Sequence, residues 1–295
     1  MDQKFKMDEE TYLCFYITNV CNLTCEGCIT YNDFKFKGHM TYTESHQKIQ
    51  DWAKLIDPPK ICILGGEPYA NPDLINWVTG IRQAWPNLDD ICVCTNGTYL
   101  NKVELSRNII NQRLWIDVSL HDPDHYNLAK TRVEEIMSVY DYNIKVTTGT
   151  NMTNATYTEE NYYIGDRLAV KFSQVYEFGS NSTKAIINNT IHMHTSDPET
   201  AHSNCKANLC HYMVRGDLYK CFLTGTSKEL LSRFNIDNNS RDALLSTKSC
   251  SPYDPIDKIQ QFLENLKNHI PQCTLCPENR INKKLWPLKP IKSSL

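Results

Sequence analysis

Short apolar segments alternate with helical ones from about residue 12 to residue 178, and this alternation constrains the fold more than any other feature of the chain. The segments are four to eight residues long and rich in β-branched residues, which is typical of buried strands. They cover residues 11–18, 60–64, 91–95, 114–120, 143–148 and 170–176. Strands and helices in strict turn, with short connections, predict a parallel sheet. Six repeats are too few for a closed eightfold barrel, so we expect an α/β fold built as a partial, TIM-like (β/α)6 barrel.

Helical patterns occupy the gaps between these segments. Thr41 and Glu44 have the spacing of a capping box, which predicts a helix that begins there and carries Ile49 and Trp52. Comparable patterns cover residues 72–85, 102–112 and 126–140. Each helix follows a strand, as a parallel sheet requires.

The alternation stops near residue 180. Residues 180–204 are rich in Ser, Thr, Asn and His, and cysteines return from residue 205 onwards. We therefore expect a core at 1–180, a linker at 181–204 and a small cysteine-rich α+β extension with a tail at 205–295.

Composition narrows the classes of function. The net charge is −3 with acids and bases interspersed, which favours neither a nucleic-acid partner nor a membrane surface. No apolar run is long enough to cross a bilayer, and the first ten residues lack the apolar core of a signal peptide, so we expect a cytoplasmic protein. In that reducing compartment, 13 cysteines predict metal ligands or buried thiols rather than disulfides.

Three cysteines, Cys21, Cys25 and Cys28, lie within eight residues directly after the first predicted strand. Soft thiolates on a short loop suit an iron–sulfur cluster. A four-iron cluster normally takes four cysteines, so a three-cysteine loop leaves one iron without a protein ligand. The alternatives are a zinc knuckle or a set of buried thiols.

The Cys-x3-Cys-x2-Cys spacing resembles the signature of the radical S-adenosylmethionine (SAM) enzymes. Further motifs stand where this resemblance requires them, at the ends of the second, third and fourth predicted strands. The residues that the resemblance places around SAM are Gly65, Gly66, Glu67, Pro68, Thr95, Asn96 and Ser119. It implies that the free iron binds SAM and that the reduced cluster cleaves SAM to a 5′-deoxyadenosyl radical, which removes a hydrogen atom from the substrate.

One position departs from the family pattern. The residue before the third cysteine is usually aromatic and packs beside the adenine, but here it is Gly27. We expect Tyr31 or Phe34 to take over this contact. Residues 147–149, at the end of the fifth predicted strand, stand where the family often contacts adenine.

The carboxy-terminal cysteines resemble the "twitch" extension, a shortened SPASM domain that holds one auxiliary iron–sulfur cluster. The resemblance implies the ligands Cys205, Cys221, Cys273 and Cys276, with Cys210 as an alternative to Cys205. A hairpin turning at Gly216 would bring Cys221 back toward Cys205. Structural zinc is the other interpretation of two such cysteine pairs.

The remaining cysteines and two histidines have plainer interpretations. We interpret the cysteines within strands as small core residues. Cys250 falls in a polar loop without an evident partner. His192 and His194 share a face if their segment is a strand, and a solvated linker strand explains them better than a metal site. The strand cysteines are Cys14, Cys62, Cys92 and Cys94.

The substrate is the least constrained part of the prediction. Side chains that share the face of Ser119, or that lie on the sixth strand, could meet it. The candidates are Asp117, His121, Lys171 and Glu177. The family resemblance favours oxidation or rearrangement of a small sugar-like or cyclitol-like molecule, with a peptide as the alternative and purine-nucleotide rearrangement disfavoured. It also implies a reducing electron donor such as flavodoxin or ferredoxin. The rival from a different class is a non-catalytic iron–sulfur or zinc protein.

Overall fold

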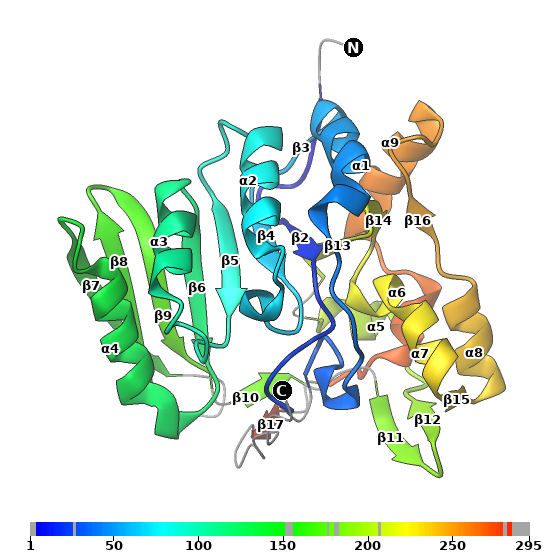
Figure 1. Cartoon of the computed structure of the whole chain (residues 1–295). Helices are drawn as coiled ribbons and strands as arrows, with labels where there is room; N and C mark the ends of the chain where they lie inside the picture. Colours follow the sequence, from blue (N-terminus) through cyan, green and yellow to red (C-terminus); the bar gives the residue numbers. More distant parts are fainter. Residues whose placement is uncertain are drawn as a thin grey trace.

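A ten-stranded sheet forms the centre of the computed structural model, which describes residues 4–25, 28–150, 156–175, 177–179, 183–205, 208–279 and 282–284. The strands follow the order β16-β14-β13-β2-β4-β5-β6-β9-β8-β7 (Figure 1). Their bounds are β2 Tyr12–Tyr16, β4 Ile61–Leu64, β5 Ile91–Thr95, β6 Trp115–Leu120, β7 Asn143–Thr150, β8 Thr156–Ile164, β9 Arg167–Gln174, β13 Cys210–Val214, β14 Asp217–Tyr219 and β16 Ser249–Cys250. The predicted α/β class with a large, mostly parallel sheet is confirmed.

The strands that make up the parallel part of the sheet are not all the ones that the sequence predicted. β13, β2, β4, β5, β6 and β9 run parallel to one another. The fifth predicted strand, β7, is not among them, and its place in the count is taken by β13 from the carboxy-terminal part of the chain. β13 lies against β2 over its whole length, from the pair Cys210 and Tyr12 to the pair Val214 and Tyr16.

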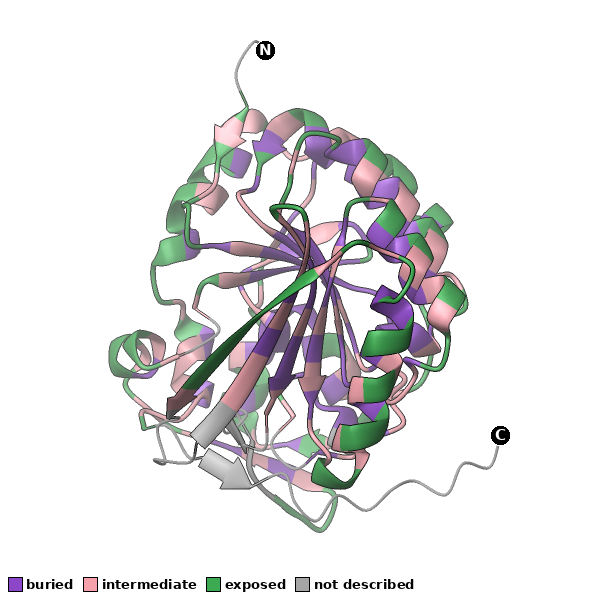
Figure 2. Cartoon of the chain, turned by 90° about the vertical axis from the view of Figure 1, so that its left-hand side faces the viewer, coloured by how far each residue is buried: buried purple, intermediate pink, exposed green. Residues whose placement is uncertain are grey.

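β7, β8 and β9 form an antiparallel meander at one edge of the sheet. The sequence prediction missed β8. The turn between β8 and β9 contains Gly165 at φ +61°, a left-handed conformation that glycine adopts without strain. Figure 2 views the molecule from this edge, where the front strand is largely exposed and covers buried strands behind it. Residues 147 and 148 are exposed on β7, three strands away from β6. This position does not suit the adenine contact predicted for residues 147–149.

Four helices cover one face of the sheet (Figure 1). They are α1 Tyr42–Leu55, α2 Leu74–Ala84, α3 Val103–Asn111 and α4 Tyr126–Met137. The capping box predicted at Thr41 is confirmed, because its backbone N–H donates to the Glu44 carboxylate. Phe15 on β2 packs edge-on against Trp85 and at a tilt against Trp77, and all three side chains are buried. This face of the sheet is therefore the hydrophobic core, and residues of opposite parity point to the other, inner face.

The hairpin predicted at Gly216 is confirmed as the connection between β13 and β14. Arg215 and Gly216 both have positive φ, as expected for a two-residue hairpin turn. Helix α1 holds this turn in place: Trp52 Nε1 donates to the Gly216 carbonyl at 3.0 Å, and Lys48 pairs with Asp217 at 2.7 Å. The barrel and the carboxy-terminal hairpin are thus joined by an extended sheet and a buried tryptophan.

Smaller elements complete the chain. They are β1 Phe5–Lys6, β3 Ile56–Asp57, β10 Glu177–Gly179, β11 Thr183–Ile187, β12 Thr190–Met193, β15 Asn235–Ile236, β17 Asn282–Lys284, α5 Pro198–Ser203, α6 Phe222–Gly225, α7 Ser227–Arg233, α8 Asn238–Leu245 and α9 Ile256–Glu264. The predicted linker thus contains a hairpin and a short helix, and the division of the chain at residues 180 and 204 stays a prediction. Within the described part of the chain, no helix has the length and apolar character needed to cross a membrane.

Candidate active site

The three-cysteine loop begins five residues after β2 ends and crosses the carboxyl end of the sheet. Cys25 is buried, whereas Cys21 and Cys28 are half-buried. Burial raises the pKa of Cys21 to about 12, so a bound metal cation is needed to hold this residue as a thiolate.

Polar groups from the residue after β5 and from the segment after Cys28 approach the sulfur atoms. Asn96 Nδ2 lies 3.7 Å from Cys21 Sγ, and Thr30 Oγ1 lies 3.2 Å from Cys28 Sγ. Hydrogen bonds to cluster sulfurs stabilise their negative charge and raise the reduction potential of a cluster. The donor set is therefore suited to an iron–sulfur cluster with one site left to another ligand.

The glycine turn predicted after the second strand packs directly onto the start of this loop. Gly66 N donates to the Thr18 carbonyl at 2.7 Å, and Glu67 N donates to the Val20 carbonyl at 2.8 Å. A Cβ on Gly66 would lie 2.3 Å from the Val20 carbonyl oxygen, and one on Gly65 would lie 2.7 Å from the Thr18 carbonyl oxygen. Glycine is needed here because two backbones touch.

The Glu67 side chain joins the turn to the end of β5 and is fully buried. Its carboxylate accepts hydrogen bonds from Thr95 Oγ1 at 2.7 Å, from Asn96 N at 2.7 Å and from Tyr69 N at 3.0 Å. Burial raises the pKa of Glu67 to about 7, against the opposing effect of these donors. Glu67 therefore positions the strand end that carries Asn96, and Asn96 in turn contacts Cys21.

Three of the four substrate candidates lie on or beside the inner face of the sheet. Asp117 pairs in register with Lys171, and Lys171 makes an ion pair of 2.9 Å with Glu159 on β8. Burial raises the pKa of Asp117 to about 6. His121 Nδ1 lies 3.0 Å from the Val175 carbonyl, and burial lowers its pKa to about 4, so the ring is neutral.

The two other predicted side chains are those of Ser119, which was expected near SAM, and of Glu177, which was expected near the substrate. Ser119 pairs in register with Ser173 and so shares the face of Asp117. Glu177 belongs not to the sixth strand but to β10, which pairs with β17. Its side chain lies outside the described residues, as does Gly27 in the cysteine loop.

The two aromatic residues expected to cover the adenine pack mainly on each other. The Tyr31 and Phe34 rings are stacked at 5.6 Å with an angle of 4° between their planes. Phe222 and Phe234 pack beside them. Tyr31 is 3% exposed and Phe34 is 7% exposed, which leaves little of either ring for a ligand.

The four carboxy-terminal cysteines line one small cavity, although they come from three separate segments. Cys205 follows α5, Cys221 precedes α6, and Cys273 and Cys276 lie in and just after a 3-10 helix at Pro271–Leu275. The segments are tied together by Thr274 Oγ1, which donates to the Ser196 carbonyl at 2.6 Å. Burial and the neighbouring thiols raise the pKa of Cys276, which again suits a bound cation.

Lys220 and His202 also line this cavity, and the sequence analysis missed both. Lys220 Nζ and His202 Nε2 are buried and have no hydrogen-bond partner among the described residues. A buried cation without a partner is costly, so these atoms fit an anionic group in the cavity. The signal available in the sequence was the position of Lys220 directly before Cys221.

Cys210, the alternative ligand, is not among the residues that line this cavity. It lies on β13 and shares a hydrogen bond with Cys14 on β2, on the inner face of the sheet. Cys250 is completely buried on β16 rather than placed in a polar loop. His192 lies on β12, whereas His194 follows that strand.

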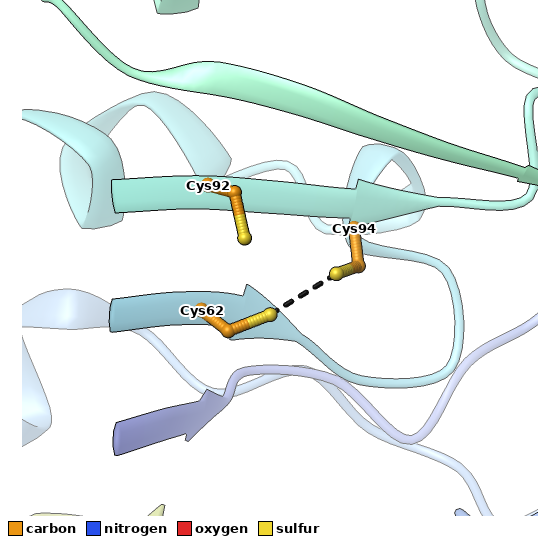
Figure 3. A group of neighbouring side chains, drawn as sticks. All are labelled: Cys62, Cys92 and Cys94. Carbon is orange, nitrogen blue, oxygen red and sulfur yellow. Dashed lines mark hydrogen bonds between the residues drawn. The ribbon is translucent and has the colours of Figure 1, made fainter. Parts of the chain in front are cut away.

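The strand cysteines gather more closely than a core interpretation requires. Cys62, Cys92 and Cys94 on β4 and β5 have all three sulfur atoms within 4.8 Å of one another (Figure 3). The sulfur atoms of Cys62 and Cys94 lie 3.0 Å apart.

Comparisons with known proteins agree with the geometry of the cysteine loop and the glycine turn. The pattern of the Radical SAM superfamily matches residues 15–160. A GTP 3′,8-cyclase of Petrotoga mobilis is 30% identical over 126 residues, which are 42% of this chain and 39% of the relative. A GTP 3′,8-cyclase of Clostridium perfringens is 31% identical over 136 residues, 44% of this chain and 39% of the relative. The chain thus spans about two fifths of the length of these curated relatives.

The comparison with solved structures found two proteins, each determined with SAM bound, at low identity to this chain. The crystal structure of BtrN in complex with AdoMet and 2-DOIA is 14% identical, with a TM-score of 0.45 over 95% of this chain and 100% of BtrN. Streptococcus suis SuiB bound to S-adenosylmethionine is 11% identical, with a TM-score of 0.29 over 45% of this chain and 38% of SuiB. The family match covers the three-cysteine loop, the glycine turn and the strand ends that meet them. The family match therefore assigns residues 15–160 of this chain to the radical SAM superfamily.

Proposed function

We propose that this enzyme uses two iron–sulfur clusters to oxidise or rearrange a small, hydroxyl-rich substrate such as a sugar or a cyclitol. Cys21, Cys25 and Cys28 would hold the cluster that binds SAM. When bound, that cluster and SAM supply a 5′-deoxyadenosyl radical, which takes a hydrogen atom from a substrate carbon. The residues of this chain position the loop, the cofactor and the substrate around that reaction.

The glycine turn and Glu67 would set the geometry of the SAM site. Gly65 and Gly66 bring the turn against the loop backbone, and Glu67 fixes the end of β5. Asn96 thereby lies beside the cysteine loop, where it and Thr95 would help to orient SAM. Ser119, at the end of the neighbouring β6, would complete the pocket.

One observation supports the auxiliary cluster: a single cavity is lined by four cysteines and by Lys220, whose Nζ has no hydrogen-bond partner in the described part of the chain. Cys205, Cys221, Cys273 and Cys276 would supply the four thiolates. A four-iron cluster held by four thiolates carries net negative charge, which the Lys220 ammonium would offset. Such a twitch-like cluster would take up the second electron of an oxidation.

A hydroxyl-rich substrate agrees with the chemistry of the inner face. Asp117, Ser119, Lys171, Ser173 and Glu159 lie on adjacent strands of this face. Carboxylates, hydroxyls and an ammonium group are the groups that hydrogen-bond to sugar hydroxyls. In this proposal the face binds and orients the substrate, and a protein such as flavodoxin or ferredoxin supplies the electron.

The proposal is tested by counting iron, sulfide and zinc per chain after oxygen-free reconstitution. The wild type is compared with a variant in which Cys21, Cys25 and Cys28 are all replaced by alanine. We expect about eight irons to fall to about four, as for two separate four-iron clusters. About four irons falling to none, with zinc retained, would identify a structural zinc site and refute the auxiliary cluster.

A further inference from the structure

We infer that Cys62, Cys92 and Cys94 form a third metal site, which binds one thiophilic d10 cation such as Zn²⁺ on the inner face of the barrel. The three residues lie on the adjacent strands β4 and β5 and are far in sequence from both predicted cluster ligand sets. Figure 3 shows their sulfur atoms pointing toward one another between the two strands.

The spacing of the sulfur atoms fits a single ion. Zinc–sulfur bonds of about 2.3 Å in tetrahedral geometry place sulfur atoms about 3.8 Å apart. The three sulfur atoms here all lie within 4.8 Å, and Cys62 and Cys94 lie 3.0 Å apart. Small side-chain rotations would therefore bring all three to coordination distance. A four-iron cluster needs its thiolates farther apart, since each binds a different iron.

The three cysteine side chains also all lie on the same face of the sheet. On β4 and β5 the positions that face the helices are aliphatic and completely buried at Ile61, Ile63, Ile91 and Val93, and only the strand-end residue Thr95 is polar. All three cysteines occupy positions of the opposite parity, since Cys62 pairs in register with Cys92 and Cys94 pairs with Asp117. Cysteines used only as small apolar residues would serve on either face.

The surroundings supply a polar neighbour and further sulfur. Asp117 Oδ2 lies 3.7 Å from Cys94 Sγ, and Lys171 is the register partner of Asp117 on the next strand. Cys14 on β2 pairs in register with Cys62 and shares a hydrogen bond with it. Three thiolates leave a fourth position of the ion for a ligand outside the three cysteines. The site lies on the same face as Ser119, where the proposed function places the substrate.

The test compares four full-length proteins, each reconstituted with iron and sulfide without oxygen, so that the two proposed cluster sites are filled first. They are the wild type, Cys62→Ser, Cys94→Ser and the control Cys250→Ser, whose thiol is also buried but lies on β16 outside the group. Each is incubated with Zn²⁺, freed of loosely bound metal by gel filtration and analysed for zinc and iron per chain. Cd²⁺ replaces Zn²⁺ in a parallel series, since its thiolate charge-transfer absorption reports sulfur ligation directly.

We expect zinc to fall by about one per chain in Cys62→Ser and in Cys94→Ser, together with the matching cadmium absorption, and to stay unchanged in Cys250→Ser. Equal zinc in all four proteins would overturn the inference, and so would an equal loss in the control. Iron per chain reports separately on the proposed function. Unchanged iron in the variants shows that they are folded, and low iron in every protein would count against the clusters and not against this site.

Discussion

Replacing Gly66 with alanine should displace the cysteine loop, because the added methyl group has no room. Its Cβ would lie 2.3 Å from the Val20 carbonyl oxygen, 2.6 Å from the Val20 carbonyl carbon and 2.9 Å from Asn32 Oδ1. A close carbon–oxygen contact in proteins is about 3.3 Å, so the backbone at Val20 has to move by about 1 Å. This movement also breaks the hydrogen bond from Glu67 N to Val20.

Two consequences of different size follow from that movement. Forcing a methylene-sized group into packed structure costs about 1–3 kcal/mol, and each kcal/mol lowers the melting temperature of a chain this long by about 2–4 °C. Misplacing reacting groups by about 1 Å costs on the order of 100-fold in rate. We therefore expect Gly66→Ala to melt a few degrees lower, to hold less iron at the three-cysteine loop and to cleave SAM about 100-fold more slowly.

The matched control is Gly165→Ala in the hairpin between β8 and β9. Gly165 has φ +61°, and a Cβ there would meet nothing within 4 Å. The left-handed backbone alone costs a residue with a Cβ about 1–2 kcal/mol, so the control should melt lower by a similar amount. It should keep wild-type iron and wild-type cleavage of SAM. If Gly66→Ala also keeps both, the close contact between the turn and the loop has no role in the site.

Three further substitutions test neighbouring parts of the site. Glu67→Gln turns an amide N–H toward Asn96 N and should cost about 1–3 kcal/mol. The folded protein raises the pKa of Glu67 from 4.5 to about 7, so the protonated side chain stabilises the fold fully below pH 4.5, and this stabilisation is lost as the pH rises through 7. The melting temperatures of wild type and variant should therefore converge between pH 4.5 and pH 7. Asn96→Asp removes the donor to Cys21 and adds negative charge, so a redox titration followed by electron paramagnetic resonance should give a lower potential for the SAM cluster. Lys220→Met should lower the potential of the auxiliary cluster, whereas Lys248→Met at an exposed position should not; equal potentials in both would show that Lys220 does not face a cluster.

Local patterns in the sequence predicted the central strands and the positions of the motifs. β2, β4, β5 and β6 lie within the predicted segments because period and turn signals are local properties. The glycine turn and Asn96 meet the cysteine loop because the carboxyl ends of parallel strands share one edge of a sheet. The role of the Glu67 side chain was not predictable, since it depends on which donors surround it after folding.

Long-range pairing was the part that local patterns could not supply. Nothing near Cys210 indicates that β13 pairs with β2, almost two hundred residues away. β8 did carry a signal, since Gly165 and Asp166 separate two strand-like runs, but the helix that precedes β7 favoured a simple strand–helix repeat. The alternation of side chains placed Asp117 with Ser119 correctly, and the same rule applied to Cys62 would have placed the three thiols together.

The measurement that tests the central claim most directly is the release of 5′-deoxyadenosine from SAM by the reduced, oxygen-free protein. Wild type is compared with Cys28→Ala and with Cys250→Ala, which removes a buried thiol away from the loop. We predict 5′-deoxyadenosine from wild type and Cys250→Ala and none above background from Cys28→Ala. If fully iron-loaded, reduced wild type released none, or if Cys28→Ala released as much as wild type, radical chemistry at the three-cysteine loop would be contradicted.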